Sequence, residues 1–335
     1  MPTTTRPSRG VLLACAVVLA GCRTDATVPG PDPGAVGPAA TVPATTSSAA
    51  PATPAPASTA TDTPAPVTTV TTPPPSPTAG PTPAPVDTPT ARAVTLPEPG
   101  ARFEYQIGGP DAPADDTVVV VRDSTAAPTG RYDVCYVNGF QTQPSETDRL
   151  LRTEPELVLH HAGEPVRDDG WPDEVLYDLT RADLRARVLE RVGKVVDGCA
   201  AAGFDAVEVD NLDSYTRSLG LIAPADTLAY VALLVERAHA AGLAFAQKNT
   251  AELTTEVRAL GADLVVAEEC REWEECDVYT SVYPVVLDVE YDRASFDAAC
   301  AEQSDAVTRL PGLTVVLRDR DVSPRSAPGS VHAAC

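Results

Sequence analysis

The sequence predicts a (β/α)8 barrel, the TIM-barrel fold, over residues 96–335. Two observations predict it. Short apolar runs rich in β-branched residues recur along this stretch, and several are separated by segments with helical spacing. Ionisable residues also stand at the C-terminal ends of successive runs, where barrels of this kind carry their chemistry. An open doubly wound sheet remains the alternative, although no glycine-rich phosphate loop follows the first runs.

Residues 1–21 have the pattern of a bacterial lipoprotein signal peptide. Arg6 and Arg9 precede an apolar run over residues 11–19, which is too short to span a bilayer permanently. The exit Leu19-Ala20-Gly21-Cys22 resembles a lipobox, in which the cysteine is lipidated and becomes the mature N-terminus. Ordinary signal cleavage nearby is the alternative. We therefore expect a cell-surface lipoprotein whose membrane contact is only the lipid on Cys22.

Residues 22–95 form a Pro/Thr/Ala-rich tether in this interpretation. Twenty of the 34 prolines precede residue 96, and large apolar residues are almost absent there. Such a segment cannot offset its ordering entropy by burial, so it is predicted to be disordered with polyproline II character. As a flexible coil it would span roughly 50 Å, long enough to hold a folded body away from the membrane.

The negative charge is confined to the predicted barrel. Residues 96–335 contain 43 acidic and 21 basic residues, which accounts for the whole formal net charge of -22. This balance argues against nucleic acid, because phosphate binding needs a basic surface. It suits a neutral or cationic ligand instead.

The spacing of the apolar residues predicts where the helices and strands of the barrel lie. Helical spacing runs over residues 181–202 and 226–241, and Gly242 follows the second as a stop signal. An additional strand-like run at 103–107 precedes the eight strands that we expect. These eight lie at residues 117–121, 132–137, 175–179, 204–209, 243–247, 264–267, 285–289 and 313–317.

Four successive predicted strands end in polar residues. Period-two alternation places Glu208 and Asp210 on one side of the strand at 204–209, with Asp213 just beyond. The next strand ends in Lys248 and Asn249. The following two end at Glu268-Glu269-Cys270 and at Asp288, Glu290 and Tyr291. One rim of the barrel therefore collects ionisable groups.

Carboxylates on separate strands favour glycoside hydrolysis. One carboxylic acid must protonate the leaving oxygen while one carboxylate attacks the sugar or activates water. The two pKa values must differ, and Lys248 is a candidate for separating them, although a rim salt bridge explains it equally well. It is one of two lysines in the chain, beside Lys194.

Motifs spread over about residues 100–320 resemble glycoside hydrolase family 114, the endo-α-1,4-polygalactosaminidase-like TIM barrels. They occur in the order of the family: Trp171-Pro172-Asp173-Glu174, residues 204–213, residues 238–243, Lys248-Asn249, Glu268-Glu269-Cys270, Glu275-Cys276 and Val289-Glu290-Tyr291. The resemblance implies a secreted enzyme that cuts α-1,4-linked galactosamine polymers of exopolysaccharide and biofilm. It implies Asp210 as nucleophile and Glu268 as acid/base.

The resemblance also implies that Lys248, Asn249, Asp213 and Tyr291 line the sugar site. We add Glu208 and Trp273 as candidate substrate-binding residues, although Glu208 could be a structural acceptor and Trp273, like Trp171, could belong to the core. The loop at residues 138–143 departs from the family, which commonly has a small-residue turn with a glutamate there.

Two other functions stay open. One is a glycan-binding or wall-associated barrel without hydrolysis, suggested by the altered 138–143 loop. The other is a metal-dependent hydrolase, since Asp210, Asn211 and Asp213 offer oxygen ligands, although without the regularity of an EF-hand. We expect no metal, no cofactor and a monomer that takes a polysaccharide substrate. His239 is assigned to helix-end packing.

Six cysteines remain once Cys15 and Cys22 are assigned to the signal and the lipid. An even number in an exported protein indicates up to three disulfides, with fifteen possible connectivities. Cys270–Cys276 would close a short loop beside Glu268, and Cys300–Cys335 would hold the C-terminal tail. Cys135–Cys199 then follows by elimination.

Overall fold

The computed structural model describes residues 93–335. The predicted signal peptide, Cys22 and nearly all of the predicted tether lie outside the described residues. No helix within residues 93–335 is long and apolar enough to cross a membrane.

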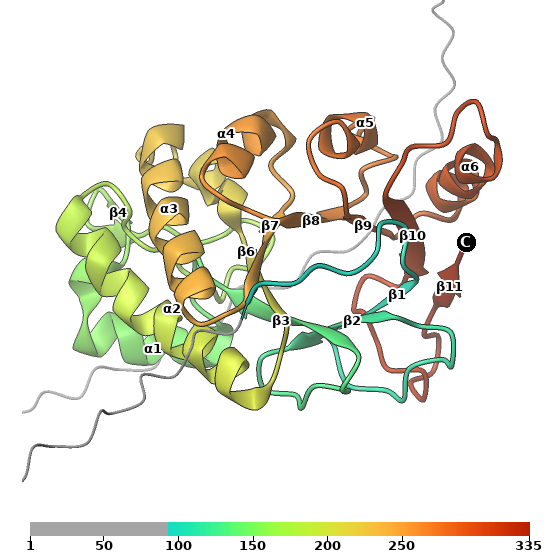
Figure 1. The fold of residues 1–335 in the computed structure, drawn as a ribbon. Coiled ribbons are helices and arrows are strands. Elements are labelled where there is room, and N and C mark those ends of the chain that lie inside the picture. Colours follow the sequence, from blue (N-terminus) through green and yellow to red (C-terminus); the bar gives the residue numbers. More distant parts are fainter. Residues whose placement is uncertain (1–92) are drawn as a thin grey trace, which may run out of the picture. The chain divides into compact units, whose positions relative to one another are not determined.

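One curled sheet forms the centre of the described body (Figure 1). Eight strands run parallel, in sheet order that follows the sequence, and a ninth pairs antiparallel with the last of them. The outermost parallel strands, β1 and β10, contact each other, so the sheet curls into the predicted (β/α)8 barrel. The nine strands are β1 (Phe103–Gln106), β2 (Val119–Asp123), β3 (Tyr132–Asn138), β6 (Ala206–Asp210), β7 (Ala244–Lys248), β8 (Leu264–Glu268), β9 (Val286–Glu290), β10 (Leu313–Arg318) and β11 (His332–Ala334).

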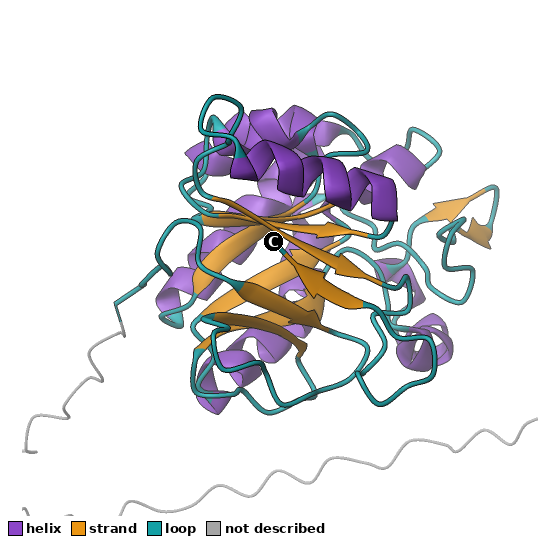
Figure 2. Ribbon diagram, turned by 90° about the vertical axis from the view of Figure 1, so that its right-hand side faces the viewer, coloured by secondary structure: helices purple, strands orange, loops and turns teal. Residues whose placement is uncertain are grey.

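Helices lie outside the strands, as Figure 2 shows. They occur from the β3–β6 connection onwards, whereas β1, β2 and β3 are joined by loops. The predicted helices are confirmed with shifts of one or two residues at their ends. The α-helices are α1 (Pro144–Thr153), α2 (Ala182–Ala202), α3 (Pro224–Ala240), α4 (Thr254–Ala259), α5 (Cys276–Thr280) and α6 (Arg293–Ser304), and the 3₁₀ turns are η1 (Pro155–Leu157), η2 (Leu212–Arg217) and η3 (Ala251–Leu253).

Alternation along the strands divides the apolar residues into two cores. From β3 to β10, one face of each parallel strand packs against the helices, where α2 buries Leu184, Val188, Val192 and Val196. The other face fills the barrel interior with a separate cluster that includes Phe103, Tyr105, Ala206, Ala244 and Ala246.

The run at 175–179 is not a barrel strand, contrary to our prediction. It is buried, but it makes isolated antiparallel bridges within the long β3–α2 connection, which also holds the hairpin β4 (His160–His161) and β5 (Glu164–Pro165). The additional run at 103–107 supplies the missing strand as β1. A short apolar run signals burial, and its periodicity does not say which sheet it joins.

Three disulfides link Cys135 with Cys199, Cys270 with Cys276, and Cys300 with Cys335. These are the pairs that the sequence favoured. The first joins β3 to α2, the second closes the loop after β8, and the third fastens the C-terminus to α6. Each pair therefore ties a strand, loop or terminus to the barrel wall.

Candidate active site

Three neighbouring parallel strands end in the residues that define the site. Asp210, Lys248 and Glu268 are the last residues of β6, β7 and β8. Because parallel strands finish at one edge of a sheet, the three side chains meet at one mouth of the barrel. The next residue has a positive φ each time, at Asn211 (69°), Asn249 (46°) and Glu269 (59°). This left-handed conformation is costly for residues other than glycine, and such strain is typical of functional sites.

Lys248 is the centre of the site. Its side chain is only 2% exposed, and Nζ lies 3.0 Å from Glu208 Oε1, 3.1 Å from Asp210 Oδ1 and 3.4 Å from Glu268 Oε2. The Tyr105 and Tyr136 rings lie beside the ammonium, with centroids at 5.7 and 5.6 Å. A buried ammonium with three carboxylate partners is held in one place, so Lys248 fixes the positions of the carboxylates around it.

Asp210 and Glu268 form a close pair across Lys248. Their two oxygens can be no more than about 6.5 Å apart, the sum of their distances to Nζ. Each carboxylate also has a tyrosine. The Tyr136 hydroxyl donates to Asp210 Oδ2 at 2.7 Å, and the Tyr291 hydroxyl donates to Glu268 Oε1. Separate strands and separate tyrosines thus give the two carboxylates different surroundings.

The surroundings shift the pKa values of Asp210 and Glu208 in opposite directions. Burial alone would raise the pKa of Asp210, but the Lys248 ammonium and the Tyr136 hydroxyl hold it below its ordinary value. Burial raises the pKa of Glu208 to about 7, against the attraction of Lys248. Burial would lower the pKa of Lys248, but its carboxylate neighbours raise it well above the ordinary value. Asp210 is therefore ionised at neutral pH, with the Lys248 ammonium as its countercharge.

A cleft of about 660 Å³ opens above these groups. Trp171, whose surface is 62% exposed, stands on its wall. The cleft brings together six of the residues that the sequence singled out: Asp210, Asp213, Lys248, Asn249, Glu268 and Tyr291.

Two candidate substrate-binding residues lie elsewhere. Glu208 is fully buried and does not line the cleft, so its role in binding substrate stays a prediction. It stands two residues before Asp210 on β6, about 7 Å deeper in the barrel at the rise of a strand. Trp273 lines a neighbouring hollow on the other side of Glu268. His239 contacts Asp263 at 2.8 Å at the end of α3, away from the cleft residues.

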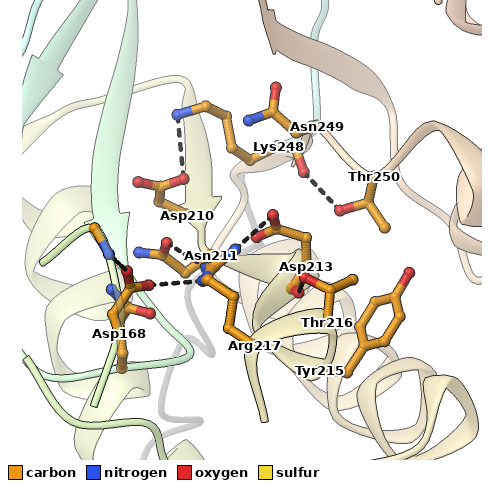
Figure 3. A network of polar contacts seen from close by, with 12 residues as sticks. Asp168, Asp210, Asn211, Asp213, Tyr215, Thr216, Arg217, Lys248, Asn249 and Thr250 are labelled. Carbon is orange, nitrogen blue, oxygen red and sulfur yellow. Dashed lines mark hydrogen bonds and ion pairs between the residues drawn. The ribbon is translucent and has the colours of Figure 1, made fainter. Parts of the chain in front are cut away.

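Arg217 organises one wall of the cleft (Figure 3). Its guanidinium donates to Asp168 Oδ2 at 2.7 Å, to Asp213 Oδ2 at 2.7 Å and to Asn211 Oδ1 at 3.0 Å. Asp213 and Asn211 thus bind a guanidinium, while Asp210 binds Lys248. These oxygens have separate cationic partners and do not converge on one point, so their arrangement does not resemble a metal site. Among the described residues, Cys270, Cys276 and Asp288 are the one group of three or more His, Cys, Asp or Glu donors that lie close enough together to hold a metal ion, and a disulfide occupies the two sulfurs.

The unusual 138–143 loop supports a carboxylate from another segment. Asn138 and Gln141 both donate to Glu174 Oε2, at 2.9 and 2.7 Å, and Glu174 lines the cleft. Burial raises the pKa of Glu174. Gly139 allows the loop to pass against β6, because a Cβ there would lie 2.1 Å from Val209 Cγ1.

Sequence reasoning missed several residues of the site. Tyr136 had a usable signal, since it shares the inward face of a predicted strand with Val134 and ends near the rim. Tyr105 lay in the run that we had counted as additional. Arg217 and Asp168 had no signal, because they are 49 residues apart and meet only in the folded chain.

These observations define a class: a (β/α)8 barrel with an acidic cleft at the ends of its strands. The chain belongs to glycoside-hydrolase family GH114, whose family model matches residues 83–335, and it is therefore a glycoside hydrolase. Among solved structures it is similar to Aspergillus fumigatus Ega3, described in complex with galactosamine, with 20% identity and a TM-score of 0.57 over 74% of this chain and 100% of that one. It is also similar to the glycoside hydrolase domain of PelA from Pseudomonas aeruginosa, with 17% identity and a TM-score of 0.47 over 69% of this chain and 96% of that one. No curated protein matches the sequence.

Proposed function

We propose that the protein hydrolyses α-1,4-linked galactosamine-type exopolysaccharide with Asp210 as nucleophile and Glu268 as acid/base. The observation that carries the proposal is the placement of these two carboxylates, from different strands, 3.1 and 3.4 Å from one buried ammonium at the floor of the cleft. Family membership supports the hydrolytic chemistry. The galactosamine in the Ega3 complex and the acidic residues of the cleft support an amine-bearing sugar.

The surroundings of the two carboxylates support this division of roles. Asp210 has a lowered pKa, because Lys248 and Tyr136 stabilise its ionised form, and a nucleophile must be ionised before it attacks. Glu268 is then the group that protonates the leaving oxygen and later takes a proton from water. Tyr291 and Asn249, which both contact Glu268, hold it in position. The Lys248 charge beside both carboxylates stabilises whichever is ionised at each step.

The short separation favours retention of the anomeric configuration. Retaining enzymes hold their carboxyl groups about 5–5.5 Å apart, whereas inverting enzymes leave about 6.5–9.5 Å for a water molecule. The two oxygens are at most about 6.5 Å apart, which is where the inverting range begins, so their separation fits the retaining arrangement better. We therefore propose a covalent glycosyl–Asp210 intermediate that water hydrolyses with help from Glu268.

The test is to incubate the protein with partly deacetylated galactosaminogalactan and to follow new reducing ends, with mass spectrometry of the products. Asp210→Asn and Glu268→Gln should each abolish release while far-UV circular dichroism and melting temperature stay close to those of the wild type. A substrate with an activated leaving group should restore glycosylation in Glu268→Gln and not in Asp210→Asn. Such a leaving group departs without help from an acid, but the reaction still needs the nucleophile. Near-normal turnover in either variant contradicts the assigned roles.

The same experiment addresses the alternative of a glycan-binding barrel without hydrolysis. Retention of the polymer on the wild-type protein without any product would favour that function over ours. Loss of activity on chelation, with recovery on adding Ca²⁺ or Mg²⁺, would instead favour the metal-dependent alternative.

We further propose that the protein is a monomer held at the outer surface of a bacterium by a lipid on Cys22. The lipobox-like sequence before Cys22 supports this, followed by 73 residues of tether. Metabolic labelling with a radioactive fatty acid should mark the wild type and not Cys22→Ser, which should appear in the medium. Equal labelling of both proteins would contradict the anchor.

A further inference from the structure

A second hollow is lined in part by Glu268. It has a volume of about 240 Å³ and shares Asp213, Asn249 and Glu268 with the main cleft. To these it adds Trp273, Glu252 and Glu275. The three shared residues make the two spaces neighbours, with Glu268 at their common boundary.

The position of the hollow relative to Asp210 and Glu268 indicates which part of the substrate it would bind. Both Asp210 and Glu268 line the main cleft, but only Glu268 lines the hollow. In the proposed reaction the sugar that becomes bonded to the enzyme sits over the nucleophile. The acid/base faces the oxygen of the departing sugar. The hollow therefore lies on the leaving-group side of the scissile bond.

Trp273 gives this hollow a large apolar surface. The side chain is on the loop that the Cys270–Cys276 disulfide closes, and 63% of its surface is exposed. A tryptophan beside an active site that is left so open to water has no role in the core. Its ring can cover the apolar face of a sugar and attract a nearby cation.

The remaining wall of the hollow is anionic. Neither Glu252 nor Glu275 forms an ion pair with any lysine or arginine of the described residues. Their side-chain contacts are tyrosine hydroxyls, from Tyr215 to Glu252 and from Tyr279 to Glu275 at 3.4 Å. Burial and the neighbouring Glu252 charge raise the pKa of Glu275, as expected for a carboxylate that no described lysine or arginine pairs with. A protonated amine would supply it.

We propose that this hollow is the leaving-group subsite, and that it selects a hexosamine unit with a free, protonated amine whose apolar face packs on Trp273. The inference rests on the proposed function and sharpens it. The enzyme would cut a chain preferentially where the sugar on the departing side has lost its acetyl group. The glycone side, over Asp210, is recognised separately in the main cleft.

The test compares galactosamine oligomers with free amines and the same oligomers after N-acetylation. Trp273→Ala should raise KM for the free-amine oligomer by about fivefold, the loss expected for one exposed cation–aromatic contact, with kcat little changed. The double variant Glu252→Gln/Glu275→Gln should raise KM for the free-amine oligomer by about threefold to tenfold and leave KM for the acetylated one unchanged. Glu272→Gln removes the same charge from the Trp273 loop without lining either space, and should behave as the wild type.

Calorimetric binding separates failure of this subsite from failure of the proposed function. The free-amine oligomer should bind Asp210→Asn more tightly than it binds Asp210→Asn/Trp273→Ala. Equal affinities, or equal KM values in the active enzymes, would overturn the subsite. The wild type could release no reducing ends while Trp273→Ala still weakened binding of the free-amine oligomer. That result would contradict the proposed hydrolysis and support the subsite.

Discussion

Replacing Glu208 by glutamine tests the electrostatic description of the barrel interior. Glu208 is fully buried, and its Oε1 accepts hydrogen bonds from Tyr105 at 3.0 Å and from Lys248. Its Oε2 has no partner among the described residues. Burial raises its pKa from 4.5 to about 7, so the folded protein binds this proton more tightly than the unfolded chain does. The stabilisation by this proton is complete below about pH 4.5 and is lost as the pH rises through 7.

The size of the effect follows from the shift. At 1.36 kcal/mol for each pKa unit, the wild type should lose about 3 kcal/mol between pH 5 and pH 8 from this group alone. Glutamine has nearly the shape of the protonated acid and does not titrate. Glu208→Gln should therefore match the wild type at pH 5 and exceed its free energy of unfolding by up to about 3 kcal/mol at pH 8.

Urea unfolding of both proteins at pH 5, 6, 7 and 8, with the disulfides intact, measures this difference. Glu272→Gln, which changes an exposed carboxylate, serves as the control and should follow the wild type at every pH. Parallel curves for wild type and Glu208→Gln would refute the reasoning. So would a variant that is less stable than the wild type at pH 8.

Three further predictions concern catalysis and packing. Lys248→Met should lower kcat by about 100-fold in the reducing-end assay, because it removes the charge shared by the catalytic carboxylates, and an unchanged kcat would exclude that role. Gly139→Ala should cost about 1–3 kcal/mol in urea unfolding, since its Cβ would meet Val209 Cγ1 at 2.1 Å, and equal stability would show that the loop moves freely. Cys300→Ser/Cys335→Ser opens a 35-residue link and should cost about 3–4 kcal/mol by the same measurement, whereas no loss would mean that the tail is held by other contacts.

Local patterns were sufficient to place the catalytic strands. Asp210, Lys248 and Glu268 could be predicted because strands alternate with period two and because parallel strands finish at a common edge. The same alternation correctly put Glu208 on the side of Asp210. The alternation could not say which residue of the strand is the first to reach the cleft. Glu208 is buried, whereas Asp210, two residues further along the strand, lines the cleft.

Contacts between distant segments could not be predicted. Tyr105 reaches Glu208 across 103 positions of sequence, and no local pattern links them. Arg217 resembles any arginine of a solvent-exposed turn until the fold places Asp168 beside it. The run at 175–179 was misplaced for a related reason, because an apolar segment buried in a long connection has the composition of a barrel strand.

The three disulfides make the final structure of this protein depend on the redox conditions in which it folds. One of them closes the loop that begins two residues after Glu268 and carries Trp273, so the surroundings of the proposed acid/base depend on a covalent link. Reducing compartments keep such thiols unbonded, whereas oxidising compartments outside the cytosol allow the disulfides to form. A preparation made in a reducing cytosol would thus have every catalytic side chain and still lack the bond that closes this loop.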